Sequence, residues 1–328
     1  MRKLFWILIV VLVSGLGTSV WAADPPGWAY GFPQAGTPAP AAAAPATPAP
    51  PDTSVKHLTG STGAFTRAQI SDRFGPADWY PGDHPAMPDI VAHGKKADVF
   101  ACSLCHYPNG KGRAENAGVA DLPVTYFIQQ MNDFRNGMRK SSEPRKANTN
   151  TMITIAKGMT DDEIKSAAEY FGAMKWTPWI KVVETSTVPK TRIAGGLFLT
   201  IEGGEKEPIG QRIIEVPEDT EATEVLRDAR SGFIAYAPTG SLKKGEALVM
   251  TGAGKTTKCG VCHGDDLKGL GPVPGIAGRS PSYLMRQMFD MQQGSRHGVW
   301  SALMKPVLSN LTETDLMDIA AYASSRKP

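Results

Sequence analysis

Two copies of one cysteine and histidine motif constrain this chain more than any other feature. All four cysteines of the 328-residue sequence lie in CSLCH at residues 102–106 and CGVCH at residues 259–263. On a helical turn, residues at positions i, i+3 and i+4 share one face. Two thiols spaced in this way each bond one vinyl group of a haem, while the histidine points at its iron. The motifs therefore predict two covalently bound haem c groups, attached and ligated by these residues: Cys102, Cys105, His106, Cys259, Cys262 and His263.

Disulfide bonds and a zinc site are two other common uses of paired cysteines. Neither use explains why a histidine follows the second cysteine of each pair. A zinc site would also have to join two pairs that lie far apart in the sequence. Haem attachment accounts for every cysteine and for both histidines, so we favour it over these alternatives.

An internal repeat indicates that the chain contains two similar domains. The stretch YFIQQMNDFRNGMR at residues 126–139 matches YLMRQMFDMQQGSR at residues 283–296, and the same offset separates the two cysteine motifs. Both stretches carry apolar residues at the helical period and reach a glycine near their ends. Their methionines lie on this apolar stripe and are interpreted as core residues rather than ligands.

Each domain also ends in a second predicted helix, MTDDEIKSAAEYF at residues 159–171 and LTETDLMDIAAYA at residues 311–323. Thr160 and Thr312 are predicted N-caps, because an acidic residue follows each of them three positions later. The segment before this helix is shorter in the second domain. We expect that segment to be a loop and to contain the sixth iron ligand.

Met152 and Met304 are the predicted sixth ligands, because each stands at the same distance before its N-cap. A thioether is a weak, neutral ligand that raises the reduction potential relative to bis-histidine ligation. The alternative is that either methionine packs in the loop and a histidine binds the iron. His297 is the rival in the second domain, but Lys140 occupies the equivalent position in the first. The remaining histidines precede the first motif and are interpreted as surface or packing residues: His57, His84 and His93.

Residues 1–22 are predicted to be a signal peptide. Arg2 and Lys3 precede an apolar core, and Val20 and Ala22 have the spacing expected before a cleavage point. The alternative is an uncleaved N-terminal anchor. In both cases the rest of the chain lies outside the cytoplasm, and we expect a periplasmic protein.

Residues 23–55 form a linker rich in proline and alanine, which cannot bury a core and is predicted to be disordered. Trp28, Tyr30 and Phe32 near its start are interpreted as a loosely packed end rather than as a docking motif. The linker leads into the first predicted haem domain at residues 56–175, which includes an N-terminal extension.

Residues 176–240 separate this domain from the second, at residues 241–328. They contain strand-like runs at WIKVVET, GGLFLTIE and QRIIEVPE, divided by glycine, proline and charged residues. The predicted fold is therefore mainly α, with two tandem haem domains and a small β-rich insertion between them. The insertion is either a structural strap over one haem or a surface that binds a partner.

These motifs resemble those of the class I cytochromes c, and specifically the bacterial dihaem family called cytochrome c-four. The resemblance rests on both CxxCH motifs, on VPGIAGRSPSYLMRQM at residues 273–288, on the G-x-R ends of the repeat and on the methionine before each final helix. It covers roughly residues 86–175 and 241–328. It implies two all-helical haem domains, His/Met ligation and periplasmic electron transfer toward a terminal oxidase or reductase.

The resemblance also implies two unequal sites. In that family a proline carbonyl orients the proximal histidine, and Pro274 would do so for His263. The aligned residue in the first domain is Ala117, which still offers a carbonyl. Arg279 stands where it would neutralise a haem propionate, whereas Leu122 occupies the matching position. Because the family joins its domains by a short linker, the insertion puts the usual paired arrangement of haems in doubt.

The predicted function is electron transfer in a respiratory chain rather than catalysis, since two saturated irons offer a substrate no open position. We expect redox protein partners, a donor dehydrogenase or respiratory complex and a terminal acceptor, and no small-molecule substrate. The formal net charge of +3 argues against a nucleic-acid partner. Contact with a membrane is expected only by proximity or through an uncleaved N-terminal segment. The alternatives are an electron-accepting subunit of a periplasmic dehydrogenase and a dihaem peroxidase in which His297 exchanges with Met304.

Overall fold

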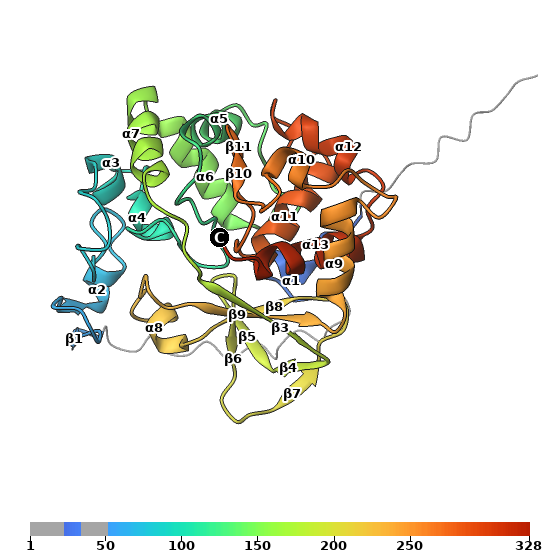
Figure 1. The fold of residues 1–328 in the computed structure, drawn as a ribbon. Helices are drawn as coiled ribbons and strands as arrows, with labels where there is room; N and C mark the ends of the chain where they lie inside the picture. The colour runs from blue at the N-terminus through green and yellow to red at the C-terminus, as the bar shows by residue number, and fades with distance from the viewer. Residues whose placement is uncertain (1–22, 34–51) are drawn as a thin grey trace, which may run out of the picture.

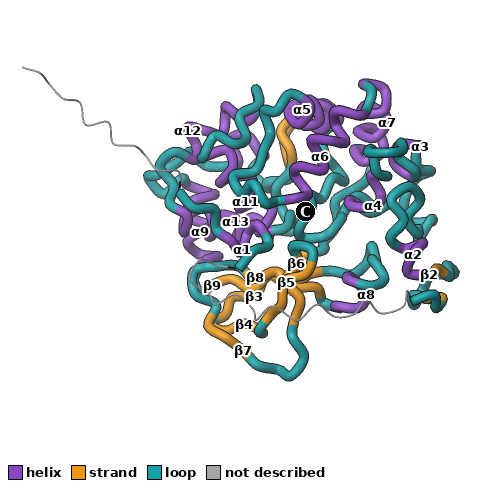
Figure 2. Tube along the Cα trace, turned by 180° about the vertical axis from the view of Figure 1, so that it is seen from behind, coloured by secondary structure: helices purple, strands orange, loops and turns teal. Residues whose placement is uncertain are grey.

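The computed structural model describes residues 23–33 and 52–328. The predicted signal peptide and most of the linker rich in proline and alanine lie outside the described residues. Two helical domains lie side by side on a layer of strands (Figure 1), and the view from behind shows the same three parts (Figure 2). Within residues 23–33 and 52–328, no helix has the length and apolar character needed to cross a membrane.

The first helical domain follows a short antiparallel hairpin. Its elements are β1 (Val55–Lys56), β2 (Phe65–Thr66), α2 (Arg67–Ile70), α3 (Asp89–Ala92), α4 (Cys102–His106), α5 (Val124–Arg135), α6 (Ala147–Gly158) and α7 (Asp161–Gly172). Helix α5 packs against α6 and α7. Their apolar faces enclose a core that includes Phe134, Ile164 and Phe171. The two helices predicted in this domain are therefore confirmed, with ends shifted by a few residues.

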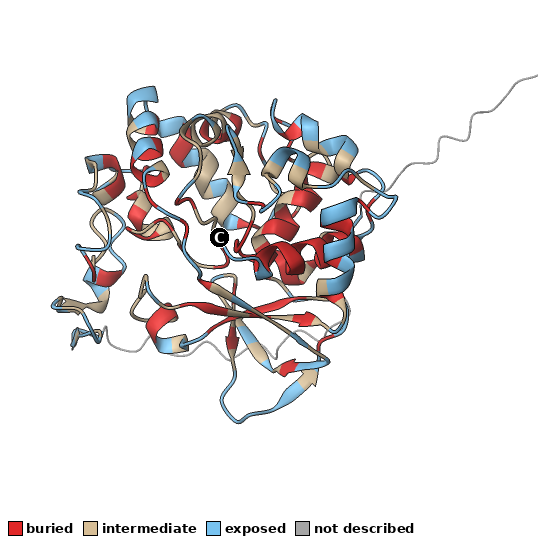
Figure 3. Ribbon diagram, in the orientation of Figure 1, coloured by how far each residue is buried: buried red, intermediate tan, exposed pale blue. Residues whose placement is uncertain are grey.

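The second helical domain repeats this plan. Its elements are α9 (Ser241–Thr251), α10 (Gly260–His263), β10 (Gly269–Leu270), β11 (Val273–Pro274), α11 (Pro281–Gln292), the 3-10 turn η1 (Ser301–Leu303), α12 (Met304–Leu308) and α13 (Glu313–Ser325). Helix α13 packs against α9 and α11 and is buried along most of its length (Figure 3). Both helices predicted in this domain are confirmed.

Capping boxes begin the last helix of both domains. The Thr160 hydroxyl accepts from the Glu163 amide, and the Glu163 carboxylate accepts from the Thr160 amide. Thr312 and Asp315 make the same reciprocal pair at the start of α13. Aspartate therefore serves here as well as glutamate, and both N-caps predicted from sequence are confirmed.

The segment between the domains forms strands β3 (Ile180–Thr185), β4 (Thr187–Pro189), β5 (Thr191–Ala194), β6 (Leu197–Thr200), β7 (Lys206–Pro208), β8 (Ile214–Pro217) and β9 (Phe233–Pro238), with helix α8 (Thr220–Glu224). Strand β9 is the centre of a three-stranded sheet, parallel to β3 and antiparallel to β8. Strands β4 and β7 pair with each other, as do β5 and β6. All three predicted strand-like runs contain a strand.

The central strand of this sheet packs against both helical domains. Phe233 at the start of β9 belongs to the core of the first domain. Ala235 and Ala237 belong to the core of the second. Alternate residues of a strand point to the same face, so one short strand holds both domains against the sheet.

The beginning of the linker is not a frayed end. Residues Gly27–Tyr30 form helix α1, and Trp28 and Tyr30 are 2% and 1% exposed. Helix α1 contacts α11, and the two lie close together in Figures 1 and 2. The Tyr30 hydroxyl donates to the Asp290 carboxylate at 2.7 Å, and Arg286 donates to the carbonyl of Ala29 at 2.6 Å. The interpretation as a loosely packed end is wrong, because its aromatic side chains complete the core of the second domain.

His84 holds the N-terminal extension against α7. Its Nε2 lies 3.0 Å from the Asp78 carboxylate, and its Nδ1 lies 3.0 Å from the Tyr170 hydroxyl. The side chain is 5% exposed. The hydrogen bond to Asp78 raises the pKa of His84 above its usual value. The protonated ring is therefore the form that the folded protein stabilises.

We expect His84→Gln to lower the free energy of unfolding more in acid than in alkaline solution. Because the folded pKa is raised, the stabilisation is complete below the unfolded value of about 6.5 and is lost as the pH rises through the folded value. The loss should be about 1.5 to 3 kcal/mol at about pH 5.5, as for a hydrogen bond to a charged group. Urea unfolding of both proteins at acid and alkaline pH measures it. A loss that is equal at both pH values would contradict the assignment.

Candidate haem sites

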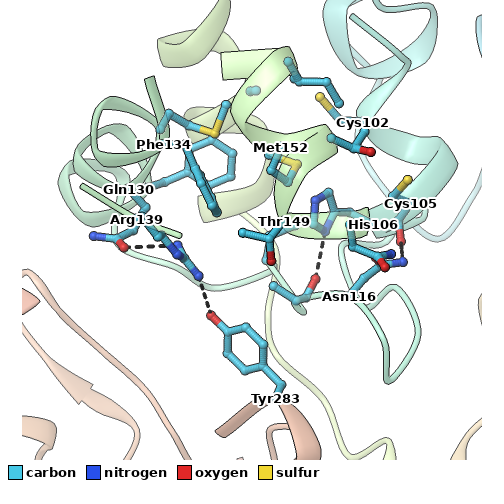
Figure 4. Close-up of a pocket in the computed structure, with 18 of the residues that line it drawn as sticks. Cys102, Cys105, His106, Asn116, Gln130, Phe134, Arg139, Thr149, Met152 and Tyr283 are labelled. Carbon is cyan, nitrogen blue, oxygen red and sulfur yellow. Dashed lines mark hydrogen bonds between the residues drawn. The ribbon is translucent and has the colours of Figure 1, made fainter. Parts of the chain in front are cut away.

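Helix α4 places the first cysteine motif in the wall of a cavity of about 310 Å³. Cys102, Cys105 and His106 all line it, as Figure 4 shows. Helices α5, α6 and α7 supply part of the remaining wall, loops of the same domain supply much of the rest, and α11 contributes Tyr283, Arg286, Gln287 and Asp290. The wall is largely apolar. Its buried apolar residues include Met131, Phe134, Ile155, Met159 and Phe171.

The second motif lines an equivalent cavity of about 200 Å³ in its own domain. Cys259, Cys262 and His263 contribute to its wall. The structure therefore brings each cysteine pair to a cavity together with its own histidine, as the motif predicts. The buried apolar residues around this cavity include Leu284, Met288, Met291 and Ile319.

Backbone carbonyls hold both motif histidines in one orientation. The Nδ1 of His106 lies 2.8 Å from the carbonyl oxygen of Ala117, and the Nδ1 of His263 lies 2.8 Å from that of Pro274. Burial lowers the pKa of both rings, so both are neutral near pH 7. A neutral ring that donates from Nδ1 presents Nε2 as a lone-pair donor for a metal. Alanine and proline provide the same bond at the same distance.

The first thiol of each motif lies in an environment that disfavours its thiolate form. Burial raises the pKa of Cys102 to about 12 and that of Cys259 to about 11. Zinc binding and disulfide exchange both use thiolates of lowered pKa. Within the described residues, no cluster of histidine, cysteine and acidic side chains is suited to a metal ion. Covalent attachment is supported by the position of each cysteine pair beside its histidine in a cavity wall, and not by the acidity of the thiols.

Met152 and Met304 each line the cavity of their own domain. Figure 4 shows Met152 among the side chains that line the first cavity, together with His106. The expectation of a loop is wrong at both positions, since Met152 lies within α6 and Met304 begins α12. Met152, Ile155 and Met159 follow the helical period, and packing this apolar stripe makes the segment helical. Ligation of iron by the two methionines stays a prediction.

The other histidines stand apart from both cavities. His297 is exposed, and its Nδ1 lies 2.9 Å from the carbonyl oxygen of Gly294. His57 and His93 are also exposed, while His84 makes the packing contacts described above. None of these four side chains lines either cavity. Met304 lines the second cavity and His297 does not, while the choice between them as iron ligand stays a prediction.

A hydrogen-bonded network of nearly two-fold symmetry joins the domains between the two cavities. Each arginine donates to the glutamine of both domains at 2.8 to 3.1 Å. Each also donates to the tyrosine of the other domain, at 2.9 and 3.3 Å. The backbones of the two arginines meet in a short antiparallel bridge. The network consists of Tyr126, Gln130 and Arg139 from the first domain and Tyr283, Gln287 and Arg296 from the second.

Sequence reasoning did not identify this network, although the repeat contained its signal. The three residue types are identical at matched positions of the two repeats, whereas most of their neighbours differ. Identical polar residues on a helix that faces a partner domain indicate a symmetric contact. The hydrogen-bond partners of each arginine could not be assigned from its own repeat, because each arginine bonds residues of both domains.

The buried arginines around the cavities lack acidic partners. Arg139, Arg279, Arg286 and Arg296 are each less than 10% exposed. Within the described residues, none of them has a carboxylate within 4.0 Å. Buried cations are normally paired. A haem brings two carboxylates and a large apolar ring, so the residues present fit the predicted group on charge, on polarity and on the placement of cysteine and histidine.

Arg279 also contacts the first domain directly. Its guanidinium donates to the carbonyl oxygens of Gly118 at 3.1 Å and Ala120 at 3.0 Å, and it lies 4.1 Å from the ring centre of Trp176. The side chain still lines the second cavity. Besides its expected role toward a propionate, Arg279 therefore has a second role. It attaches the start of α11 to the first domain.

Comparison with known proteins found relatives among the bacterial cytochromes c. No family model matches the chain. The chain is similar to cytochrome c-554(548) of Halomonas halodenitrificans, with 40% identity over 77 residues, which are 23% of this chain and 93% of that protein. It is also similar to cytochrome c4 of Azotobacter vinelandii, with 38% identity over 84 residues, which are 24% of this chain and 40% of that protein.

Among solved structures, the cytochrome c4 of Acidithiobacillus ferrooxidans is similar, with a TM-score of 0.44 and 20% identity. That similarity covers 68% of this chain and 98% of the other. In sequence, the chain spans less than half of the Azotobacter vinelandii cytochrome c4 and nearly the whole of the Halomonas halodenitrificans cytochrome.

Proposed function

We propose an electron-carrier function from one premise: the chain belongs to the class I c-type cytochromes and carries two covalently bound haem c groups. The observation that carries the proposal is a wall shared by the two cavities. Leu122, Tyr126, Tyr283 and Gln287 line both of them. The two sites are neighbours within one molecule, so an electron that arrives at one has a short route to the other. The insertion does not separate them.

The residues of the chain have distinct tasks in this function. Each haem, when bound, supplies an iron that gains or loses one electron. His106 and His263 hold a neutral Nε2 in place through their carbonyl partners. In the proposal, Met152 and Met304 would supply the sixth ligand of each iron, since each lines the cavity of its own domain. The apolar walls exclude water, and the network of arginine, glutamine and tyrosine keeps the two domains in one relative position.

The mouth of the second site has the character of a docking surface for a protein partner. Exposed apolar side chains gather around it, with Leu270 60%, Val261 54% and Leu303 68% exposed. Exposed lysines stand among them at positions 258, 268 and 305. By contrast, the insertion covers the first motif, since Arg227 donates to the carbonyl of Leu104. We propose that electrons enter and leave through the second domain.

Electron exchange with a natural donor tests this function. Respiratory membranes of the source bacterium, supplied with an oxidisable substrate, should reduce the purified protein at both haems. Leu270→Asp should slow this reduction about tenfold or more, because it places a charge in an apolar contact. Ile201→Asp is the matched control, since Ile201 is 46% exposed on the insertion. Equal slowing by both variants would contradict the docking surface, and no reduction of the unmodified protein would contradict the carrier.

Export to the periplasm and redox proteins as partners are parts of the same proposal. The exported location rests on the predicted signal peptide at residues 1–22. Neither proposed iron site leaves room for a substrate once a methionine occupies the sixth position, which supports a carrier rather than an enzyme. The exposed position of His297 gives no support to the peroxidase alternative.

A further inference from the structure

Lys146 is a buried cation with no acidic partner. It is 4% exposed and lines the cavity of the first domain. Within the described part of the chain, no carboxylate lies within 4.0 Å of its ammonium. Burial and the nearby Arg286 lower the pKa of Lys146 to about 7. An isolated ammonium in such a place is costly unless an anion accompanies it.

The neighbours of Lys146 do not supply that anion. Glu115 is nearby, but its carboxylate lies 2.6 Å from the guanidinium of Arg113 and pairs with it. Asp290 also lines the cavity, but its carboxylate accepts bonds from the Tyr30 hydroxyl and the Ser142 amide. Glu115 Oε1 thus pairs with Arg113 while Oε2 has no hydrogen-bond partner, and neither Glu115 nor Asp290 forms an ion pair with Lys146 among the described residues.

The turn between β5 and β6 closes the space above the ammonium. Gly196 in this turn has a φ of +86°, and a methyl group there would come within 3.4 Å of the Lys146 Nζ. Glycine is the residue that adopts this conformation without strain and leaves the space open. The insertion thus shields Lys146 from solvent on one side, and the cavity is on the other.

We propose that Lys146 is the counter-ion of a carboxylate of the first haem and that it raises the reduction potential of this site alone. The inference rests on the proposed function, since it requires a haem in the first cavity. A haem propionate is the only anion that the premise brings to this wall. The ammonium neutralises its charge, and a less negative environment favours the reduced iron.

Among the described residues, no lysine occupies the matched position in the second site, whose buried cations are Arg279 and Arg296. Counting back from the predicted ligand, Gly298 corresponds to Lys146, because both stand six residues before the methionine. Counting from the repeated helix, Leu303 corresponds to it instead. Lys305 is exposed. The shorter segment in the second domain has removed the position, so the two sites differ in the cations of their walls as well as in the residue whose carbonyl accepts from the motif histidine.

A redox titration of purified protein with both haems in place tests the proposal. Lys146→Gln should lower the potential of one of the two one-electron steps and leave the other in place. Lys146→Arg should retain the unmodified value, because it keeps the charge. Lys157→Gln is the matched control, since Lys157 is exposed on the same helix as Met152. The affected step is assigned with Met152→His and Met304→His, each of which should lower only its own step.

The outcomes distinguish the role of Lys146 from the proposed electron-carrier function. Unchanged potentials in Lys146→Gln, or a shift of equal size in Lys157→Gln, would overturn the role of Lys146 while leaving the electron carrier intact. The role of Lys146 would also be overturned if Lys146→Gln shifted the potential of the second site, which is the step that Met304→His lowers. If Lys146→Gln loses haem or unfolds, Lys146→Met replaces it, because methionine keeps the length of the side chain without its charge. Failure of the unmodified protein to exchange electrons would instead contradict the proposed function.

Discussion

Met304→Ala should open the second iron site to external ligands while the first site stays closed. Alanine removes the thioether and is too short to reach the iron, so the oxidised variant should lose the part of the methionine-to-iron absorption band that this site contributes. Cyanide should then bind one haem per chain rapidly. Met152→Ala should have the same effect on the first site, because Met152 lines the first cavity as Met304 lines the second.

The control for this experiment is a methionine of the same cavity that lies on the core stripe. Met288→Leu conserves side-chain volume, and Met288 is 9% exposed in the wall of the second cavity. Volume-conserving changes of this kind cost little stability. The control should keep the absorption band and resist cyanide. If Met304→Ala kept the absorption band and Met288→Leu lost it, the ligand would have been assigned to the wrong methionine.

Trp28→Ala should lower the free energy of unfolding by about 3 to 5 kcal/mol, the usual cost of truncating a buried large aromatic side chain. Trp28 is 2% exposed and belongs to the core of the second domain, although it precedes that domain by more than half of the chain. Chemical denaturation, followed by far-UV circular dichroism, measures the loss. The expected result would establish that α1 is a structural part of the second domain.

Met250→Ala is the control for Trp28→Ala. Met250 is 43% exposed on α9 of the same domain, so its truncation should change stability by less than about 0.5 kcal/mol. A loss of similar size in both variants would indicate a general sensitivity of this domain. If Trp28→Ala lowered the free energy of unfolding by less than about 1 kcal/mol, α1 would be a frayed end rather than a part of the second domain.

The local features of the fold could be predicted because their causes are local. Thr160 and Thr312 cap helices through bonds to residues three positions later, and the apolar stripes of α5 and α11 are visible in the repeat. The motif histidines could be assigned because their tasks follow from the spacing of the cysteines. The helical setting of Met152 was missed, since polar and β-branched residues around it hide a short apolar stripe.

The contacts between distant segments could not be predicted in this way. Tyr30 bonds Asp290 across 260 positions of sequence, and nothing near either residue specifies the other. Nothing in the sequence around Lys146 distinguishes it from a lysine on the surface. It becomes a candidate counter-ion only when the turn at Gly196 covers it and the nearby carboxylate of Glu115 pairs with Arg113.

The sequence by itself determined that the protein has two haem attachment motifs, two duplicated helical domains and one matched methionine in each. These follow from residue types at short spacings, where the geometry of one helical turn dictates which atoms can meet. Tertiary structure alone decided how the sites differ and how they adjoin. Burial, charge pairing and the shared cavity wall depend on which distant segments pack together, and the short-range pattern of a chain does not encode that choice.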